Sequence, residues 1–310
     1  MDSVVQPSAA EQQDPLAAWH VPLEDLSFDD VAPLGSGALG EVKRATWTNN
    51  GLKLATKRLF FMATDAAAIK AMGGALDTQA RETVLQDFIK ECSINASLRH
   101  PNIVMFLGVA VDRSANNKPQ FLLMELMSHS LHDEIYPGGA IPRQGNPMEL
   151  ARMASILLDI SRALAYLHSR HPPVLHLDLK PTNVLIDRSG TAKLADLGEA
   201  HVIQSARRAT VGAYGVGTPL YMAPEMKIEG VPRGPAADMF SLGLIVCEMS
   251  LGRTPSANDA KAAEQNRAAD LQAMKHVELQ KIVEHLVIDE ADQRWDALRV
   301  QAFLQVVADV

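Results

Sequence analysis

The feature that most constrains the fold is a change in the spacing of apolar residues along the chain. Between Leu26 and Phe60, short β-like runs alternate with glycines, and Asn49-Asn50-Gly51 separates two of them, which is typical of a β-hairpin. From Leu150 to Leu167, apolar residues recur every three or four positions, as on one face of a helix. We therefore expect an α+β fold with a β-rich first third and a helical remainder.

The same rules predict the remaining elements. We expect helices over 83–98 and 236–251, strands near 103–111, 120–126, 183–186 and 192–194, and two further helices before the C-terminus. Residues 61–78 are rich in Ala and Gly and are predicted to form a loop that is partly helical. Residues 1–18 are polar and contain Pro, so they are predicted to be a flexible tail. The change in pattern predicts two lobes joined near Met127, at about 26–126 and 127–310.

Composition excludes several classes of protein. With 47% hydrophobic and 21% charged residues, the chain is not a disordered or collagen-like protein. Two cysteines cannot build a disulfide framework, which favours a reducing compartment. The net charge of −8 argues against nucleic-acid binding, although seven of the 37 acidic residues and none of the 29 basic ones lie within 1–30, so the rest is nearly neutral. No signal peptide and no membrane-spanning stretch is visible, so we expect a cytoplasmic protein.

A glycine-rich segment, Gly35-x-Gly37-x-x-Gly40-x-Val42, lies between two of the β-like runs. Without a Cβ atom, its backbone N–H groups could approach phosphate oxygens closely. Alone this spacing is weak evidence, and a glycine-rich hairpin explains it equally well; a dinucleotide fold is disfavoured because a strand follows. Lys57 on the next strand and Glu91 on the next helix add a cation and a partner, although each could instead be a solvated surface charge.

A second group of polar residues lies on one predicted loop, 176–183, with the sequence His-Leu-Asp-Leu-Lys-Pro-Thr-Asn. Asp178 could accept the proton of an attacking hydroxyl, Lys180 could neutralise a transferring phosphoryl group, and Asn183 could ligate a divalent cation. Asp196, which follows a predicted strand, offers a second hard oxygen ligand for Mg²⁺. This combination indicates phosphoryl transfer.

From about Leu26 to the C-terminus, the chain resembles eukaryotic-type protein kinases. The matching motifs occur in the family's order and spacing: the glycine-rich segment, Lys57 and Glu91, the loop around Asp178, Asp196-Leu197-Gly198, and the run from Gly217 to Ala223-Pro224-Glu225. Residues 19–26, 43–47 and 99–104 are similar to the tyrosine-kinase-like group, as in Raf-like and mixed-lineage kinases, most of which phosphorylate serine and threonine. The resemblance implies a bilobal kinase domain over 19–310, with a small antiparallel β-sheet lobe containing one main helix and a larger, mostly helical lobe.

The resemblance also implies a function and a set of site residues. It implies a serine/threonine kinase that uses ATP and Mg²⁺ on protein substrates, with regulatory protein partners. It assigns catalysis to Asp178, Lys180, Lys57 and Glu91, and the metal to Asn183 and Asp196. The implied nucleotide contacts are Leu34, Gly35, Gly37, Gly40, Val42, Ala55, Lys57, Met124, Glu125, Met127 and Leu185. It further implies that Arg294 pairs with Glu225 and that Asp238 is structural.

Departures from the family pattern leave an alternative open. Leu177 replaces an Arg that normally binds a phosphate on the activation segment, so we expect little dependence on phosphorylation of Thr210. Asn95 replaces an apolar residue, and a buried amide costs about 1–3 kcal/mol unless it finds a hydrogen bond. About fifteen extra residues lie between Lys57 and Glu91. The alternative is a pseudokinase that acts as a nucleotide-sensitive scaffold; a small-molecule kinase is disfavoured by the complete activation segment.

Two histidines have a spacing that a metal site could use. His168 and His171 lie three residues apart but lack nearby Cys or acidic companions in the sequence. We therefore expect them to be surface histidines.

Overall fold

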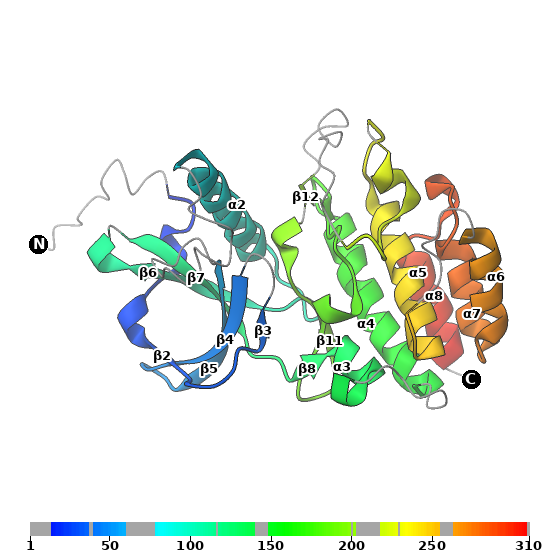
Figure 1. The fold of residues 1–310 in the computed structure, drawn as a ribbon, viewed down its shortest axis with the longest axis horizontal. Helices are drawn as coiled ribbons and strands as arrows, with labels where there is room; N and C mark the ends of the chain where they lie inside the picture. The colour runs from blue at the N-terminus through cyan, green and yellow to red at the C-terminus, as the bar shows by residue number, and fades with distance from the viewer. Residues whose placement is uncertain are drawn as a thin grey trace, which may run out of the picture. The chain divides into compact units, whose positions relative to one another are not determined.

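The computed structural model describes residues 14–36, 40–59, 78–115, 117–139, 148–199, 201–202, 218–228, 230–254 and 263–308 (Figure 1). The chain divides into two compact units, Met1–Arg99 with Met105–Leu126, and His100–Val104 with Met127–Val310. The sequence predicts residues 100–104 in the first lobe, but they belong to the second unit. The reason is backbone hydrogen bonding, because Val104 N donates to Leu194 O at 2.9 Å and Leu194 N donates to Asn102 O at 2.9 Å.

The first unit is a mainly antiparallel sheet with one long helix, α2 (Thr78–Ser97). Its strands are β1 (His20–Pro22), β2 (Leu26–Phe28), β3 (Gly35–Ser36), β4 (Gly40–Trp47), β5 (Leu52–Leu59), β6 (Phe106–Asp112) and β7 (Lys118–Glu125). They follow the order β1-β6-β7-β5-β4-β2, β3 pairs with β4, and only β1 runs parallel to its neighbour. The predicted hairpin is confirmed, with Gly51 at a φ of 72°. Helix α2 begins five residues before the predicted start, and residues 61–77 of the predicted loop lie outside the described residues.

Two hydrophobic clusters stabilise this unit, one on each face of the sheet. Alternate residues of β6 separate between them, because Val109 and Val111 join one cluster and Ala110 joins the other. The first cluster includes Phe88 and Cys92 of α2. The helix is therefore attached to the sheet through this cluster, as its course along β6 and β7 in Figure 1 shows.

Residues 14–18 differ from the flexible tail that their composition predicts. Leu16 is only 2% exposed and belongs to the same cluster as Phe88. Its backbone N–H donates to Oδ1 of Asp14 at 2.9 Å, and a short 3-10 helix, η2 (Ala17–Trp19), follows. The prediction failed here because a single buried side chain orders the segment, whereas composition averages over many residues. Residues 1–13 of the predicted tail lie outside the described residues.

The second unit is mostly helical. Its helices are α3 (Leu131–Ile135), α4 (Leu150–His168), α5 (Pro235–Leu251), α6 (Ala263–Ala273), α7 (Val277–Leu286) and α8 (Ala297–Ala308). Its strands are β8 (His129–Ser130), β9 (Val174–Leu175), β10 (Val184–Ile186), β11 (Ala192–Leu194) and β12 (His201–Val202), in two small sheets ordered β11-β10-β8 and β12-β9. The predictions for α4, α5, β10 and β11 are confirmed to within about one residue.

Among the described residues, three helices follow α5, not the predicted two. The sequence of α6 is mostly polar and has no apolar stripe, so the apolar spacing did not reveal it. Polar groups dock this helix instead, because Arg253 pairs with the buried Asp270, and Arg267 donates to Val287 O at 3.1 Å and to Asp289 at 2.9 Å.

Helix α5 forms the centre of the second unit, as its nearly all-round apolar sequence predicts. It is buried from Ala237 to Ser250 and packs against α4 and α7. At Gly243, a Cβ atom would lie 2.8 Å from Cβ of Leu286 and 2.6 Å from Cγ2 of Val287. The close approach of α5 and α7 therefore requires glycine at this position.

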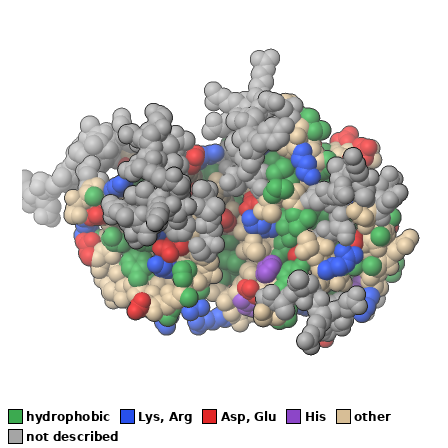
Figure 2. Space-filling view, viewed as in Figure 1, with side chains coloured by type: hydrophobic (Ala, Val, Ile, Leu, Met, Phe, Trp, Pro, Cys, Tyr) green, Lys and Arg blue, Asp and Glu red, His purple; other side chains and the backbone are tan. Residues whose placement is uncertain are grey.

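The described surface carries charges of both signs. On the face shown in Figure 2, Lys and Arg side chains are interspersed with Asp and Glu side chains over the described residues. Among the described helices, none combines the length and the apolar character needed to cross a membrane.

Candidate functional site

In the first unit, Lys57 and Glu91 form a buried ion pair. Nζ of Lys57 on β5 donates to Oε1 of Glu91 on α2 at 2.6 Å, and the two side chains are 17% and 7% exposed. The register holds Lys57 between Val42 of β4 and Leu122 of β7. The expected pairing is confirmed, and such burial rules out two independent solvated surface charges.

The described part of the glycine-rich segment lies in β3 and at the start of β4. Leu34 N donates to Val42 O at 2.7 Å, and Gly35 pairs with Val42 in the ladder. A Cβ atom at Gly35 would meet nothing within 4 Å, so its backbone faces open space. Gly37 lies outside the described residues, and Gly40 begins β4. The geometry suits both a simple hairpin and a loop that covers phosphates.

The other expected nucleotide contacts lie in both units. In the first, the register places Ala55 of β5 beside Met124 of β7. Next to Met124, the Glu125 carboxylate accepts from Met105 N at 2.7 Å, and Glu125 N donates to Met105 O at 3.0 Å. These bonds fix the end of β7. In the second unit are Met127, at its boundary, and Leu185, which pairs with Ser130 of β8.

In the second unit, Asp178 is the centre of a dense hydrogen-bond network. Its Oδ1 accepts from the N and Oγ1 of Thr218 at 2.8 and 2.9 Å. Its Oδ2 accepts from Nζ of Lys180 at 2.7 Å and from Nδ2 of Asn183 at 3.0 Å. Lys180 also donates to Oγ1 of Thr218 at 2.7 Å. Four donors thus hold one carboxylate in a fixed orientation beside a cation.

Asn183 and Asp196 offer the oxygen donors that Mg²⁺ prefers. Nδ2 of Asn183 also donates to the backbone O of Asp178 at 2.9 Å, so the side-chain Oδ1 is the oxygen that Asn183 could offer a cation. Asp196 has an exposed carboxylate and a φ of 60°. Among the described residues there is no cluster of three or more His, Cys, Asp or Glu suited to a metal ion. A divalent cation here would combine these two residues with substrate phosphate and water oxygens, which is a common arrangement for Mg²⁺.

A buried carboxylate fixes the backbone just before Asp178. Asp238 of α5 accepts from His176 N at 2.9 Å and from Leu177 N at 2.8 Å. These bonds hold Leu177 at a φ of 63°, a left-handed conformation that is uncommon for a leucine. Because two backbone donors are used, the loop that carries Asp178 has one preferred path.

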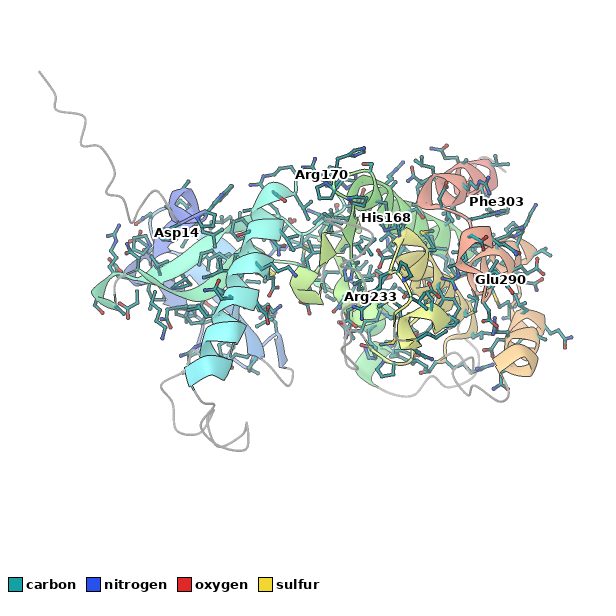
Figure 3. The ribbon with its side chains drawn as sticks, turned by 90° about the horizontal axis from the view of Figure 1, so that it is seen from above. Asp14, His168, Arg170, Arg233, Glu290 and Phe303 are labelled. Carbon is teal, nitrogen blue, oxygen red and sulfur yellow. The ribbon has the colours of Figure 1, made fainter. Side chains whose placement is uncertain are left out.

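His168 is not the surface histidine that the sequence predicts. Its Nε2 lies 2.8 Å from Oδ2 of Asp238, and its side chain is only 11% exposed (Figure 3). Burial alone would raise the pKa of Asp238, but the hydrogen bond and charge interaction with His168, aided by His176, lower that pKa overall. His171 is exposed, as predicted.

The expected pair of Arg294 and Glu225 is also confirmed. Two guanidinium nitrogens of Arg294 donate to the two carboxylate oxygens at 2.7 and 2.9 Å, and the Arg294 side chain is fully buried. The remaining donors reach the backbone oxygens of Ala236, Ile288 and Asp289. This bidentate pair fixes the segment after Ala223 against α5.

A second buried carboxylate of α5, Glu248, was not expected from the sequence. Glu248 of α5 is 1% exposed and accepts from the hydroxyls of Tyr136 at 2.7 Å and Tyr221 at 2.5 Å. It links α3, α5 and the segment that contains Thr218. One signal could have revealed it: Asp238 and Glu248 are the only carboxylates in an otherwise apolar helix.

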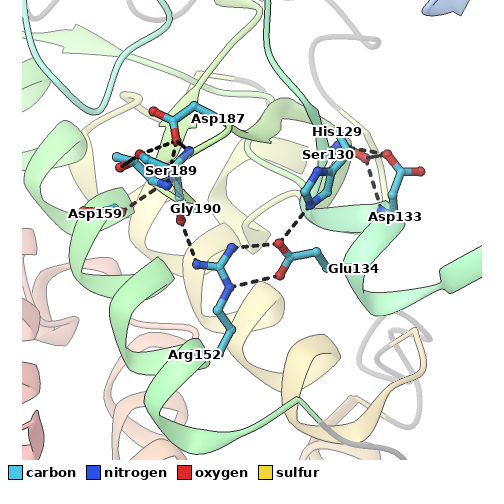
Figure 4. Close-up of polar contacts among 11 residues, drawn as sticks. His129, Ser130, Asp133, Glu134, Arg152, Asp159, Asp187, Ser189 and Gly190 are labelled. Carbon is cyan, nitrogen blue, oxygen red and sulfur yellow. Dashed lines mark hydrogen bonds and ion pairs between the residues drawn. The ribbon is translucent and has the colours of Figure 1, made fainter.

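Helix α3 is anchored beside β10 by the network in Figure 4. Arg152 of α4 donates to both carboxylate oxygens of Glu134 at 2.7 and 3.2 Å and to Gly190 O at 2.7 Å. Nε2 of His129 lies 2.9 Å from Oε1 of Glu134. Burial would raise the pKa of Glu134, but Arg152 and His129 lower it overall. These contacts brace the small sheet that carries Leu185.

The question left open at Asn95 is settled by a local hydrogen bond. Its Nδ2 donates to Glu91 O, one helical turn earlier, at 2.8 Å. The half-buried amide is therefore not without a partner, and the cost expected for an unsatisfied amide does not arise.

Comparisons with known proteins agree with this geometry. Residues 28–303 match the family described as protein kinase domain. The chain is 31% identical over 239 residues to the serine/threonine-protein kinase CTR1 and 32% identical over 245 residues to the serine/threonine-protein kinase VIK, both of Arabidopsis thaliana. It is 33% identical over 248 residues to the seven transmembrane domain-containing tyrosine-protein kinase 1 of Dictyostelium discoideum.

These alignments cover 77%, 77% and 78% of this chain but only 25%, 49% and 31% of the respective relatives. The chain thus spans between a quarter and a half of the length of the curated relatives it matches. The family match, by contrast, extends over most of the chain and includes every motif described above except the segment before residue 28. The chain belongs to the protein kinase family.

Proposed function

We propose that this chain is a protein kinase that transfers the γ-phosphoryl group of ATP to serine and threonine hydroxyls of protein substrates. The observation that carries the proposal is the carboxylate of Asp178, held by Lys180, Asn183 and Thr218. The buried pair of Lys57 and Glu91 supports it. A scaffold would have no chemical need for all of these groups in hydrogen-bonded geometry.

Each residue has a specific role in the proposed reaction. Lys57, oriented by Glu91, and the backbone of the glycine-rich segment bind the nucleotide phosphates. Asp178 orients the acceptor hydroxyl and takes its proton, while Lys180 neutralises charge on the transferring group. Asn183 and Asp196 would hold Mg²⁺, which would supply positive charge to the phosphate oxygens. Catalysis then consists of positioning and charge stabilisation, without a covalent intermediate.

Serine and threonine are the proposed acceptors for two reasons. Lys180 lies two residues after Asp178 and Thr218 directly before Pro219, as in the serine/threonine kinases that the chain resembles. Two of the three relatives above are named serine/threonine-protein kinases, while one is named a tyrosine-protein kinase. Phosphoamino-acid analysis of the labelled product decides between them: label on tyrosine alone would contradict the proposed acceptors.

We also propose that the activity depends little on phosphorylation of the activation segment. Leu177 is buried, and its apolar side chain offers no donor to a phosphate. Thr210→Ala should therefore keep at least about half of the wild-type kcat, because no cationic partner is lost. A Thr210→Ala variant without activity, restored by Thr210→Glu, would refute this. Thr210 itself lies outside the described residues.

The pseudokinase alternative has lost one of its two supports. It rested on Asn95 and Leu177, and Asn95 has a hydrogen-bond partner. For the location, Cys92 and Cys247 are both free and buried, which supports a reducing, cytoplasmic compartment. Regulatory protein partners remain part of the proposal.

The decisive experiment measures phosphate incorporation from ATP into a generic acceptor protein. Asp178→Ala should lower kcat by at least the ~10²–10⁴-fold expected for a lost general base. Asp292→Ala, which removes an exposed carboxylate of the same unit, should leave kcat unchanged. Nucleotide binding is measured for all three proteins. Equal incorporation by wild type and Asp178→Ala, or none by either while nucleotide still binds, would refute the kinase activity.

A further inference from the structure

A segment outside the family match contributes to the core of the first unit. The match begins at residue 28, whereas the described chain begins at Asp14, labelled in Figure 3. We name residues Asp14–Pro22 the N-terminal strap. It comprises η2 and β1, and its residue Leu16 is among the largest fully buried side chains of the described chain.

The strap packs into the cluster that holds α2 on the sheet. Leu16 shares this cluster with Phe88 and Cys92 of α2 and with strand residues of β6 and β7. Trp19 packs edge-on against Phe106, with ring centroids 5.2 Å apart. Arg99, two residues after the end of α2, places its guanidinium 4.9 Å from the centre of the Trp19 ring. The strap therefore contacts the surroundings of α2 at several points.

Strand β6 is shaped to receive the strap. β1 pairs in parallel with β6, with His20 opposite Val109 and Pro22 opposite Val111. A Cβ atom at Gly108 would lie 2.7 Å from the backbone O of Trp19 and 3.1 Å from Cγ2 of Val21. Only glycine permits so close an approach, so the docking depends on a particular residue of β6.

The cluster lies next to the residue that orients Lys57. On α2, Glu91 follows Phe88 by three residues and directly precedes Cys92. Oε1 of Glu91 accepts from Nζ of Lys57 at 2.6 Å. Because a helix moves as one body, a small shift at Phe88 and Cys92 displaces Glu91 as well. Buried cores repack in discrete steps rather than deform smoothly. Loss of Leu16 from the cluster would therefore change how often the pair forms.

We infer that Leu16 is a positioning residue for Glu91, and that the N-terminal strap sets the fraction of molecules in which the pair of Lys57 and Glu91 is formed. This inference rests on the proposed kinase function for its effect on rate. It does not rest on that function for its effect on α2.

A double-mutant cycle tests whether Leu16 acts through Glu91. Leu16→Ala should lower kcat roughly 10-fold in the wild-type background, because a small displacement of an orienting group is costly in rate. In the Glu91→Gln background the same change should lower kcat less than about 2-fold, because coupled residues are not additive. Leu26→Ala is the matched control: it removes a buried leucine from the other cluster of this unit and should act equally in both backgrounds.

Hydrogen exchange of residues 85–97 provides a readout that does not need kinase activity. Leu16→Ala should speed the exchange of these α2 amides, whereas Leu26→Ala should not. Thermal unfolding of every variant verifies folding, and Leu16→Val replaces Leu16→Ala in the cycle if the alanine variant is unfolded at the assay temperature. Leu16→Met should restore most of the activity, because it refills the volume.

The outcomes separate the strap from the proposed function. Additive effects of Leu16→Ala and Glu91→Gln on kcat, or unchanged exchange of α2, would overturn the inference. A wild type that binds nucleotide but transfers no phosphate would refute the kinase activity, and the exchange of α2 would still decide whether Leu16 positions this helix.

Discussion

At the scale of single residues, the contribution of a side-chain amide to stability depends on the carbonyl to which it donates its hydrogen bond. Asn95 donates to Glu91 O within its own helix, at 2.8 Å. Asn102 is 3% exposed and donates to Ala192 O, ninety residues away, at 3.0 Å. The first bond is made to a carbonyl that the helix already supplies with a donor, whereas the second ties two distant segments of the second unit together.

We therefore predict different costs for the same substitution. Asn95→Ala should change the free energy of unfolding by less than about 0.5 kcal/mol, because the lost bond of about 1 kcal/mol is offset by the higher helix propensity of Ala, up to roughly 0.7 kcal/mol. Asn102→Ala should cost about 1–3 kcal/mol, because a buried carbonyl loses its donor. Urea denaturation measures both; an equal loss of stability in the two variants would contradict this account.

Residue partners could be predicted only where a known pattern supplied them. The pairs of Lys57 with Glu91 and of Arg294 with Glu225 were expected from the family resemblance. The pairing of His168 with Asp238 was not, and His168 was expected on the surface. Spacing along the chain shows which residues share a face of one helix, but the partner here comes from α5, and only the tertiary approach of α4 and α5 brings the two side chains together.

At the scale of elements, packing between helices outweighs helix propensity at Gly243. Alanine is the better helix former by about 1 kcal/mol, so propensity alone favours Gly243→Ala. A Cβ atom there would lie 2.6 Å from a side-chain atom of Val287, which directly follows α7, and 2.8 Å from one of Leu286, the last residue of α7. Both distances are well inside ordinary contact distance. Overpacking of a core costs about 1–3 kcal/mol. The cost of overpacking is therefore larger than the gain in helix propensity, and the substitution should destabilise the protein.

Gly243→Ala should therefore destabilise the protein by up to about 2 kcal/mol net, because α7 must move away from α5 and only about 1 kcal/mol of helix propensity offsets this. Gly234→Ala is the matched control, because a Cβ atom at this N-cap of α5 would meet nothing within 4 Å. Its cost should stay below about 1 kcal/mol. Thermal unfolding measures both variants, and a Gly243→Ala protein more stable than wild type would show that the two helices are not in tight contact.

Helices and strands could be predicted where the residues that they bury recur at regular intervals in the sequence. Helix α4 was located to within a residue because its apolar stripe faces the core. Helix α6 was missed because ion pairs of Arg253 and Arg267 dock it, and the order of residues 14–18 was missed because a single leucine, Leu16, anchors them. Apolar periodicity reports hydrophobic burial over several turns, and it is insensitive to elements held by one or two contacts.

At the scale of the whole molecule, several carboxyl groups of the second unit have a lowered pKa. They include Asp133, Glu134, Asp187 and Asp238. Burial raises the pKa of each, but hydrogen bonds and neighbouring cations lower the pKa by more than burial raises it. In the first unit, the pKa of the partly exposed Asp112 is lowered chiefly by its hydrogen bond to Ser114. Acid should therefore destabilise the second unit.

The sign of this effect follows from proton binding. A carboxyl group whose pKa is lowered in the folded state binds a proton more readily when the chain is unfolded. For Asp238, whose ordinary pKa is 3.8, the stabilisation is present above about pH 4 and is lost as the pH falls through the lowered pKa of the folded state. The second unit should thus lose stability as the pH falls through this range, which hydrogen exchange of its peptides can follow between about pH 7 and pH 3.

Asp238→Asn isolates the contribution of one fully buried carboxylate to this acid response. The amide keeps the shape but cannot ionise, so it weakens the interaction with His168 and removes one titrating group. We expect a lower free energy of unfolding of the second unit at about pH 7 and a shallower fall below about pH 4, because the unfolded state no longer gains that proton. Asp112→Asn, a partly exposed site in the first unit, should leave the acid response of the second unit unchanged. If Asp238→Asn fell as steeply with pH as the wild type, the acid sensitivity would have to come from Asp133, Glu134 and Asp187, whose networks brace α3 and the turn between β10 and β11 rather than the loop that carries Asp178.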